Sequence, residues 1–192
     1  MLYDGLVFFR PSLTHFGHNQ GFIYKPRGFS SIQENDETIV EKFNSVVQPK
    51  DDLYLLGDLM LGDNEHGLNC LRQLNGNLHI LWGNHCTDVR KKLYKTLPNV
   101  IETLGYAGML KYKKWRFYLS HYPTITDNLN DVSKPWEQVK CLYGHTHQKT
   151  NFYNDNSLLY HVGVDSHNCY PVSIDQVVED IKAKFLECKN ML

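Results

Sequence analysis

Short apolar runs alternate along the chain with amphipathic segments, and this alternation predicts a mixed α/β fold. Apolar runs bounded by Gly or polar residues predict strands at 2–9, 53–56, 78–82, 140–145 and 158–164, and a hairpin over 106–121. Apolar residues at helical spacing predict helices at 30–47, 67–76, 87–97 and 173–188. Repeats, low-complexity stretches and linkers are absent from the sequence, which predicts one domain over residues 1–192.

Local signals mark several ends of these elements. Ser31 with Glu34, and Ser173 with Gln176, have the spacing of capping boxes at helix N-termini. Gly76 is expected to be the C-cap of the helix at 67–76. In the hairpin, Lys113 and Lys114 fall near the tip, where solvation explains them better than phosphate binding.

Composition narrows the class of protein. Hydrophobic residues make up 42% of the chain and charged residues 21%, as in soluble globular proteins. A formal net charge of −1 gives no basic field, which argues against an extended nucleic-acid surface. The five cysteines contain no C-x-x-C pair, so we expect neither a disulfide framework nor a thiolate zinc site, and we expect a cytoplasmic location. The apolar run at 1–9 lacks a basic leader, and no run reaches membrane-spanning length.

Polar side chains that can bind metal follow several of the predicted strands. Ligands in α/β proteins bind just beyond the carboxyl ends of strands, so such residues are expected to converge on one crevice. A single histidine in such a place is more often a turn or core residue, but five strand ends of this kind are hard to attribute to chance. The residues are His15 and His18 after the first strand, Asp58 after "LYLL", Asn84 and His85 after "HILW", His121 after "FYLS", and His145 and His147 after "CLY".

The types of these side chains indicate the chemistry. Imidazole, carboxylate and amide groups without thiolate suit Mn²⁺, Fe, Zn²⁺, Co²⁺ or Ni²⁺. The candidate ligands exceed what one tetrahedral ion needs, which favours two ions about 3.5–4 Å apart. Asp58 is the carboxylate placed to bridge them. His145 and His147 would point the same way if their segment is extended, so each could serve one ion.

The order of the segments "THFGH", "GD", "GNH", "SHYP" and "GHTH" resembles the calcineurin-like metallophosphoesterases, in particular a small branch found in bacteria and phages. This resemblance implies a four-layer α/β sandwich, in which two β-sheets pack together and helices flank them. It also implies a metal-dependent phosphoesterase with two divalent ions, Mn²⁺ favoured. Its substrate would be a small phosphodiester or nucleotide-type ester.

The resemblance also implies roles for individual residues. His15 and His147 would hold the first ion, Asp58 would bridge, and Asn84, His121 and His145 would hold the second. Gly83 would make the turn that presents Asn84, and His85 would protonate the leaving oxygen while a bridging hydroxide attacks in line. Weaker expectations are that His18, Asn19 and Arg27 contact the substrate phosphate, with loop packing as the alternative. Asp165 either supports a metal-binding histidine or caps a turn, and His66 and His79 are expected to be structural.

Two positions depart from the family pattern. Leu13 stands where the family has the Asp of Asp-x-His, and Asp4 is too far along the strand to replace it. Cys86 stands where the family has Asp after "GNH", and we expect a small buried side chain there. The alternative is therefore a catalytically degenerate member that binds a nucleotide or a protein partner without turnover. A purely structural metal domain fits worst, because structural sites are closed and rich in thiolate.

Leu13 also generates a prediction about metal content. Without the family's Asp, the first ion keeps His15, Asp58 and His147 as protein ligands, so we expect it to be held weakly. Metal content measured after gel filtration in metal-free buffer, and activity measured at low metal, should both be reduced. Recovery of two tightly bound ions from the isolated protein would contradict this expectation.

Overall fold

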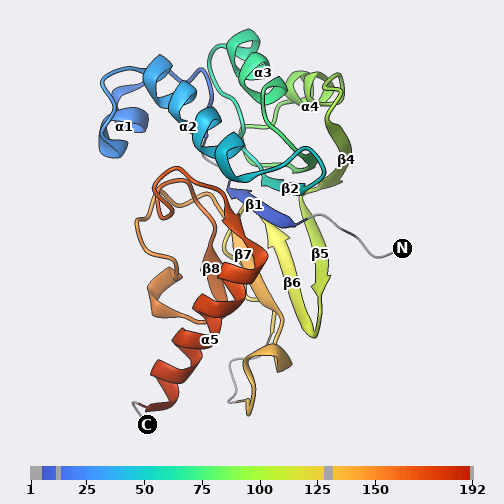
Figure 1. Ribbon diagram of the computed structural model, residues 1–192, viewed down its shortest axis with the longest axis vertical. Helices are drawn as coiled ribbons and strands as arrows, with labels where there is room; N and C mark the ends of the chain where they lie inside the picture. Colours follow the sequence, from blue (N-terminus) through green and yellow to red (C-terminus); the bar gives the residue numbers. More distant parts are fainter. Residues whose placement is uncertain (1–5, 12–13, 128–131, 191–192) are drawn as a thin grey trace.

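Two mixed β-sheets pack together and helices flank them in the computed structural model, which describes residues 6–11, 14–127 and 132–190 (Figure 1). The first sheet has the order β4-β3-β2-β1-β9, and the second has the order β5-β6-β7-β8. The first contains β1 (Val7–Pro11), β2 (Asp52–Leu56), β3 (Asn77–Leu81), β4 (Val100–Gly105) and β9 (Val172–Ser173). The second contains β5 (Ala107–Tyr112), β6 (Trp115–Ser120), β7 (Lys140–Tyr143) and β8 (Leu159–His161).

Strands β1 to β4 run parallel, while β9 is antiparallel to β1 and β5 is antiparallel to β6. Strands β6, β7 and β8 are parallel to one another. The carboxyl ends of the parallel strands are where this fold is expected to present ligands. The helical segments are α1 (Gly21–Tyr24), η1 (Lys25–Arg27), α2 (Ile32–Val46), α3 (Asn64–Arg72), α4 (Asp88–Tyr94), η2 (Pro135–Glu137), η3 (Tyr153–Asp155) and α5 (Ile174–Asn190).

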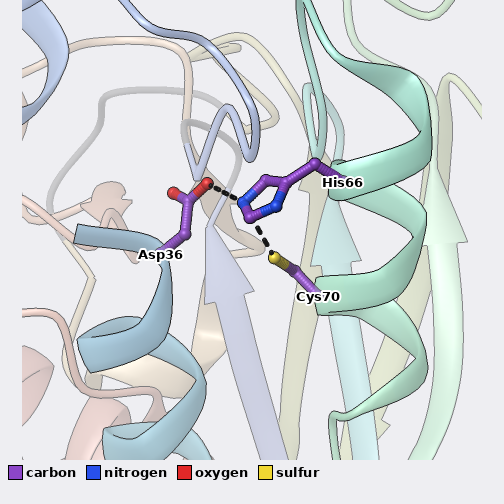
Figure 2. Close-up of side chains that lie close together, drawn as sticks. All are labelled: Asp36, His66 and Cys70. Atoms are coloured by element: carbon purple, nitrogen blue, oxygen red, sulfur yellow. Dashed lines mark hydrogen bonds and ion pairs between the residues drawn. The ribbon is translucent and has the colours of Figure 1, made fainter. Parts of the chain in front are cut away.

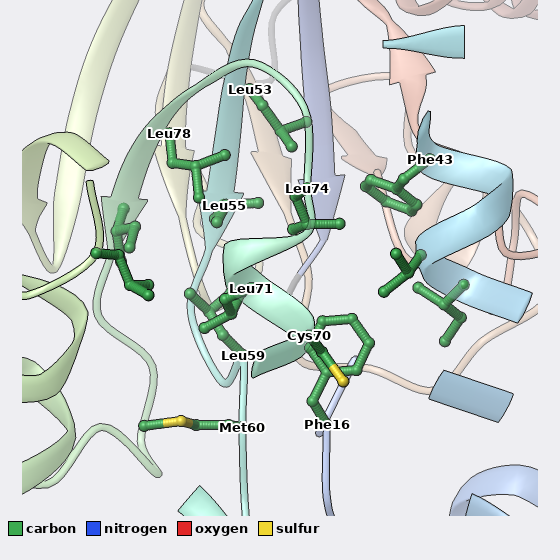
Figure 3. Close-up of a cluster of buried hydrophobic side chains, with 14 of the residues drawn as sticks. Phe16, Phe43, Leu53, Leu55, Leu59, Met60, Cys70, Leu71, Leu74 and Leu78 are labelled. Carbon is green, nitrogen blue, oxygen red and sulfur yellow. The ribbon is translucent and has the colours of Figure 1, made fainter. Parts of the chain in front are cut away.

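The alternation of side chains along β2 and β3 divides the core into two layers. Leu53 and Leu78, which are paired in register, face α2 and α3 and belong to a cluster that includes Phe43 and Leu71 (Figure 3). The opposite faces of the same strands carry residues such as Leu56, which pack against the second sheet. Side chains of successive residues in a strand point to opposite faces, so one run of apolar residues fills both layers.

Helix α5 completes the layer between the sheets. Its buried residues Val177, Val178 and Ile181 join the same cluster as Phe117 and Leu142 of the second sheet. The expected α/β architecture of two packed sheets with flanking helices is confirmed. Within the described ranges, none of the helices has the length and apolar character needed to cross a membrane.

The two predicted capping boxes lie at the starts of α2 and α5, but each forms only in part. Ser31 Oγ accepts the Glu34 N–H (3.2 Å), but the Glu34 carboxylate bonds to Ser30, so only half of that capping box is confirmed. Ser173 Oγ likewise accepts the backbone N–H of Gln176. The Gln176 side chain donates to Asp180 and does not return to Ser173. The prediction that Gly76 is the C-cap of the helix at 67–76 was wrong.

Helix α3 starts earlier than expected, at Asn64, and ends at Arg72 with Gln73 as its C-cap. Gly76 has a φ of 96° in the turn before β3, where a Cβ would lie 2.9 Å from the Asp51 carbonyl oxygen. Strands β4 and β9 and the short α1 were not predicted. The first strand, predicted over 2–9, is described from Val7, and residues 1–5 lie outside the described residues. The hairpin with Lys113 and Lys114 at its tip is confirmed.

A buried lysine lies at the start of β7. Lys140 is fully buried, and its Nζ donates to Gln138 Oε1 (3.3 Å). Burial lowers the pKa of Lys140 to about 8, against the opposing charge of Asp127. The folded chain therefore favours neutral Lys140 at a pH where the unfolded chain still carries the proton.

This lysine predicts how stability depends on pH. Between about pH 8 and the ordinary lysine pKa of 10.5, the unfolded state binds more protons, so the free energy of unfolding rises with pH. The rise from this one group is on the order of 3 kcal/mol. Lys140→Met should abolish it in urea unfolding across this window, whereas Lys111→Met, at an exposed position of β5, should retain it. Equal pH slopes in the two variants would contradict the prediction.

Candidate metal centre

Polar side chains that follow strands of both sheets lie close together. Asp58 and Asn84 follow β2 and β3 of the first sheet, and His121 and His145 follow β6 and β7 of the second. The Asp58, His121 and His145 ligand atoms all lie within 4.8 Å of one another. The sequence-predicted convergence of strand ends is thus observed for these residues.

The His121 imidazole is the centre of the group. Its Nδ1 donates to the Leu56 carbonyl oxygen (2.9 Å), so in the neutral ring Nε2 carries a lone pair. That Nε2 lies 2.8 Å from Asn84 Oδ1, 3.0 Å from Asp58 Oδ2 and 3.0 Å from His145 Nδ1. Even a protonated Nε2 has one hydrogen to offer. Three atoms that can each donate a lone pair, on Asn84, Asp58 and His145, therefore surround a fourth, the His121 Nε2. A cation would stabilise this arrangement.

Asp58 supplies the negative charge. Its carboxylate is buried, and Oδ1 accepts the backbone N–H of His85 (2.8 Å). Burial raises the pKa of Asp58, but the hydrogen bond and charge of a protonated His121 Nε2, together with the His85 N–H, outweigh it and hold this pKa below its ordinary value. The carboxyl group is therefore ionised at neutral pH and able to ligate.

Glycines make room for this carboxylate. A Cβ on Gly83 would collide with the Asp58 side chain, and one on Gly57 would lie 2.5 Å from the Gly83 nitrogen. Gly57 has a φ of 87°, whereas Gly83 does not have a left-handed backbone. Gly83 begins the turn as expected, since its carbonyl oxygen accepts the Cys86 N–H (3.2 Å), and it is also needed for close approach to Asp58. The turn itself is closed by Cys86, which is buried and whose Sγ accepts the Gly83 N–H (3.2 Å).

His15 and His147 form a second group beside the first. Their rings are stacked with centroids 5.8 Å apart. Burial lowers the pKa of His15 to about 3, so the ring is neutral, and its Nδ1 has no hydrogen-bond partner among the described residues. A buried imidazole nitrogen without a partner is a position that a metal ion would satisfy.

Asp165 orients His147. Asp165 Oδ2 accepts from His147 Nδ1 (2.9 Å), and Asp165 Oδ1 accepts from Arg27 Nε (2.7 Å). Burial raises the pKa of Asp165, but the bond to His147 and the Arg27 charge lower it to about 2. The sequence left Asp165 between a supporting role and a turn cap, and these contacts favour support. The Arg27 side chain is 2% exposed and is held by Asp165, and contact of Arg27 with a substrate phosphate stays a prediction.

Three of the predicted ligands have strained backbones. His15, Asp58 and His145 have φ values of 46°, 47° and 59°, in the left-handed region that residues with a Cβ rarely adopt. Such strain clusters at functional sites, because the surrounding structure must be selected to hold it. The "GHTH" segment is consequently not extended. His145 points to His121 and His147 points to Asp165, so the two histidines still serve opposite sides of the group.

The remaining predicted residues lie at the edge of the candidate metal centre. His85 is exposed, with its ring centroid 5.8 Å from that of His15. The ring centroid of His18 lies 5.5 Å from that of His15, and His18 Nδ1 has no hydrogen-bond partner among the described residues. Asn19 is exposed beside it. Leu13 lies outside the described residues.

Two supporting residues were missed in the sequence. Asn35 Oδ1 accepts from Arg27 Nη1 (3.2 Å), and Asp36 Oδ2 accepts the N–H of Gly17 (2.9 Å) in the loop between His15 and His18. Both are fully buried on α2. Their signal was present, because they occupy core-facing positions in an otherwise apolar helical stripe.

Comparison with known proteins identifies the class. Residues 32–168 match the calcineurin-like phosphoesterase superfamily domain, and the chain belongs to this superfamily. An uncharacterized protein of Methanocaldococcus jannaschii, MJ1445, is 30% identical over 186 residues, 93% of this chain and 94% of that protein. The crystal structure of AQ665 from Aquifex aeolicus, a protein of unknown function, has the same fold, with a TM-score of 0.65 and 22% identity over 92% of this chain and 99% of that one. An archaeal phosphodiesterase is more distant, with a TM-score of 0.45 and 16% identity over 82% of each chain.

The support of His147 by Asp165 can be tested by metal binding. Asp165→Asn keeps the size of the side chain but removes the charge that orients the imidazole. We expect affinity for Mn²⁺, measured by isothermal titration calorimetry, to fall about 10–100-fold. Asp175→Asn, a carboxylate that bonds to Tyr112 and Lys113 on the hairpin, is the matched control and should bind normally. Unchanged affinity in the Asp165 variant would show that His147 does not depend on this contact.

Proposed function

We propose that this protein is a metal-dependent phosphoesterase that acts on phosphodiesters or nucleotide-type substrates. The observation that carries the proposal is the convergence of Asp58, Asn84 and His145 on His121 Nε2 at the carboxyl ends of strands from both sheets. Membership of the calcineurin-like phosphoesterase superfamily supports the reaction class.

The side chains fit two divalent ions. One group, Asn84, His121 and His145, would hold one ion, and His15 and His147 would hold the other, with Asp58 between them. Nitrogen and oxygen donors without thiolate suit Mn²⁺, Fe, Zn²⁺, Co²⁺ or Ni²⁺, and we propose Mn²⁺ as the ion to test first. Bound there, the ions would neutralise the phosphate oxygens and make water acidic enough to act as a nucleophile.

His85 is the candidate acid. A new P–O bond forms from the water oxygen as the bond to the leaving oxygen breaks, and a proton from His85 would neutralise that oxygen. The exposed ring is free to face a substrate, while its backbone N–H is fixed on Asp58. Arg90 donates to the His85 carbonyl oxygen (2.8 Å) and to Asn64, so the turn is held from both sides.

A neighbouring pocket favours nucleotide-type substrates. It has a volume of about 360 Å³ and shares His147 and Asp165 with the candidate metal centre. Phe22 and Phe29 supply aromatic walls, and Lys42 and Lys149 supply positive charge; together these would suit a flat base and further phosphate or sugar oxygens.

The decisive experiment is Mn²⁺-dependent hydrolysis of bis-p-nitrophenyl phosphate. His85→Ala should lower kcat by about 10²–10⁴-fold, the range for a lost general acid, while its Mn²⁺ affinity stays unchanged. His121→Ala is the contrasting variant, because it should lose metal and turnover together.

The outcomes separate the hypotheses. Metal-dependent turnover that collapses in the His85 variant supports the proposed acid. Turnover that survives there would reject His85 as the acid but keep the phosphoesterase. If the unaltered chain shows no activity above either variant even at saturating metal, the phosphodiesterase proposal fails. The degenerate binding protein suggested by Leu13 then becomes the better explanation.

A further inference from the structure

Two histidines expected to be structural, His66 and His79, contact side chains that are not candidate ligands of the metal centre, and their environments differ. His79 is paired within the first sheet with Glu102 (2.7 Å) and Asp52 (3.1 Å), which explains its burial. His66 instead meets Asp36 and Cys70, on α2 and α3 (Figure 2). The ligand atoms of these three side chains all lie within 4.8 Å of one another.

The arrangement of these three groups is not that of a nucleophilic triad. In such a triad the acid and the nucleophile bind opposite nitrogens of the imidazole, so that a proton can pass through the ring. Here Asp36 Oδ2 (2.9 Å) and Cys70 Sγ (3.5 Å) both approach the same atom, His66 Nε2. One nitrogen has one lone pair or one hydrogen, so the ring cannot relay a proton between the two groups.

The Asp36 carboxylate has mainly neutral donors around it. The side chain is fully buried and accepts the Gly17 N–H (2.9 Å) and the Asn35 amide (2.8 Å) in addition to the contact with His66. Burial raises the pKa of Asp36. A cation beside Oδ2 would offset the cost of placing this charge in the interior.

We propose that Asp36, His66 and Cys70 form a zinc site separate from the candidate metal centre. Tetrahedral zinc with about 2.0 Å bonds to nitrogen and oxygen and about 2.3 Å to sulfur needs N···O and N···S separations of about 3.3 and about 3.5 Å. The observed separations are 2.9 and 3.5 Å. These two separations are within a few tenths of an ångström of what the ion needs, and the Asp36 oxygen and Cys70 sulfur, which would need about 3.5 Å, lie within 4.8 Å of each other.

The donor set favours zinc over harder ions. A thiolate together with an imidazole selects zinc-like metals, whereas Mn²⁺ and Mg²⁺ favour oxygen ligands. His66 and Cys70 are four residues apart on α3, which places them on one face of the helix. The His66 side chain is 35% exposed, so water can reach the fourth position. The expectation of no thiolate zinc site was based on the absence of a C-x-x-C pair. A site with one cysteine, one histidine and one aspartate does not need such a pair.

The position of this site suggests what the ion would do. Asp36 fixes the N–H of Gly17, in the loop that carries His15 and His18. An ion held by Asp36 would tie α2, α3 and this loop together. The site would therefore link these segments while its fourth position stays open to water, and it shares no ligand with the loop that carries His15 and His18.

Cobalt distinguishes the two sites, because a cobalt–thiolate bond gives a charge-transfer absorption that nitrogen and oxygen ligands do not. Co²⁺ titration of the full chain should produce this absorption, and Zn²⁺ should remove it by displacement. Cys70→Ser should lose the absorption completely. Cys86→Ser is the matched control, because that buried thiol lies beside the candidate metal centre and should not contribute.

A second variant keeps the test valid if Cys70→Ser does not fold. His66→Gln alters a partly exposed side chain, so its fold should persist by circular dichroism while the absorption is lost. No absorption in the unaltered chain at saturating Co²⁺, or full absorption in folded His66→Gln, would overturn the zinc site. Neither result depends on phosphoesterase turnover, so this inference and the proposed function fail independently.

Discussion

The ionised carboxylate of Asp58 is the constraint on which the centre of this structure depends. A charge in the interior costs several kcal/mol unless hydrogen bonds and opposite charge compensate it. The compensation comes from His121 of the second sheet and from the His85 N–H of the first. Gly83 must lack a side chain for the carboxylate to fit. The packing of the two sheets, the turn after β3 and the left-handed backbone at Asp58 therefore satisfy a single requirement.

Much of this could be predicted from the sequence, since the signals are local. An apolar run followed by Gly and a polar residue identifies a strand and its carboxyl end, and this pattern placed Asp58, Asn84, His121 and His145 correctly at strand ends. The fold class followed from the same alternation together with the ordered motifs. The strand at β4 was missed, because its sequence "VIETLG" alternates weakly and is largely half-exposed.

What the sequence could not provide depends on contacts between distant segments. The turn at Gly83 was predicted, but its second role was not, because nothing local shows that a carboxylate from position 58 lies against its Cα. The link from Arg27 through Asp165 to His147 joins residues more than a hundred positions apart. Asn35 and Asp36 are the exception. Polar residues on the apolar face of a helix signal a buried role, even though their partners could not be named.

The origin of the candidate ligands in two different sheets has a thermodynamic consequence. An ion bound by Asp58 and Asn84 from one sheet and by His121 and His145 from the other would cross-link the layers. Separation of the sheets would then require release of the ion, so binding and cohesion of the fold are linked by mass action. At a free ion concentration of about 100 times Kd, this linkage adds about 2.7 kcal/mol. The same atoms that would hold the ion would thus make the durability of the protein depend on the supply of metal.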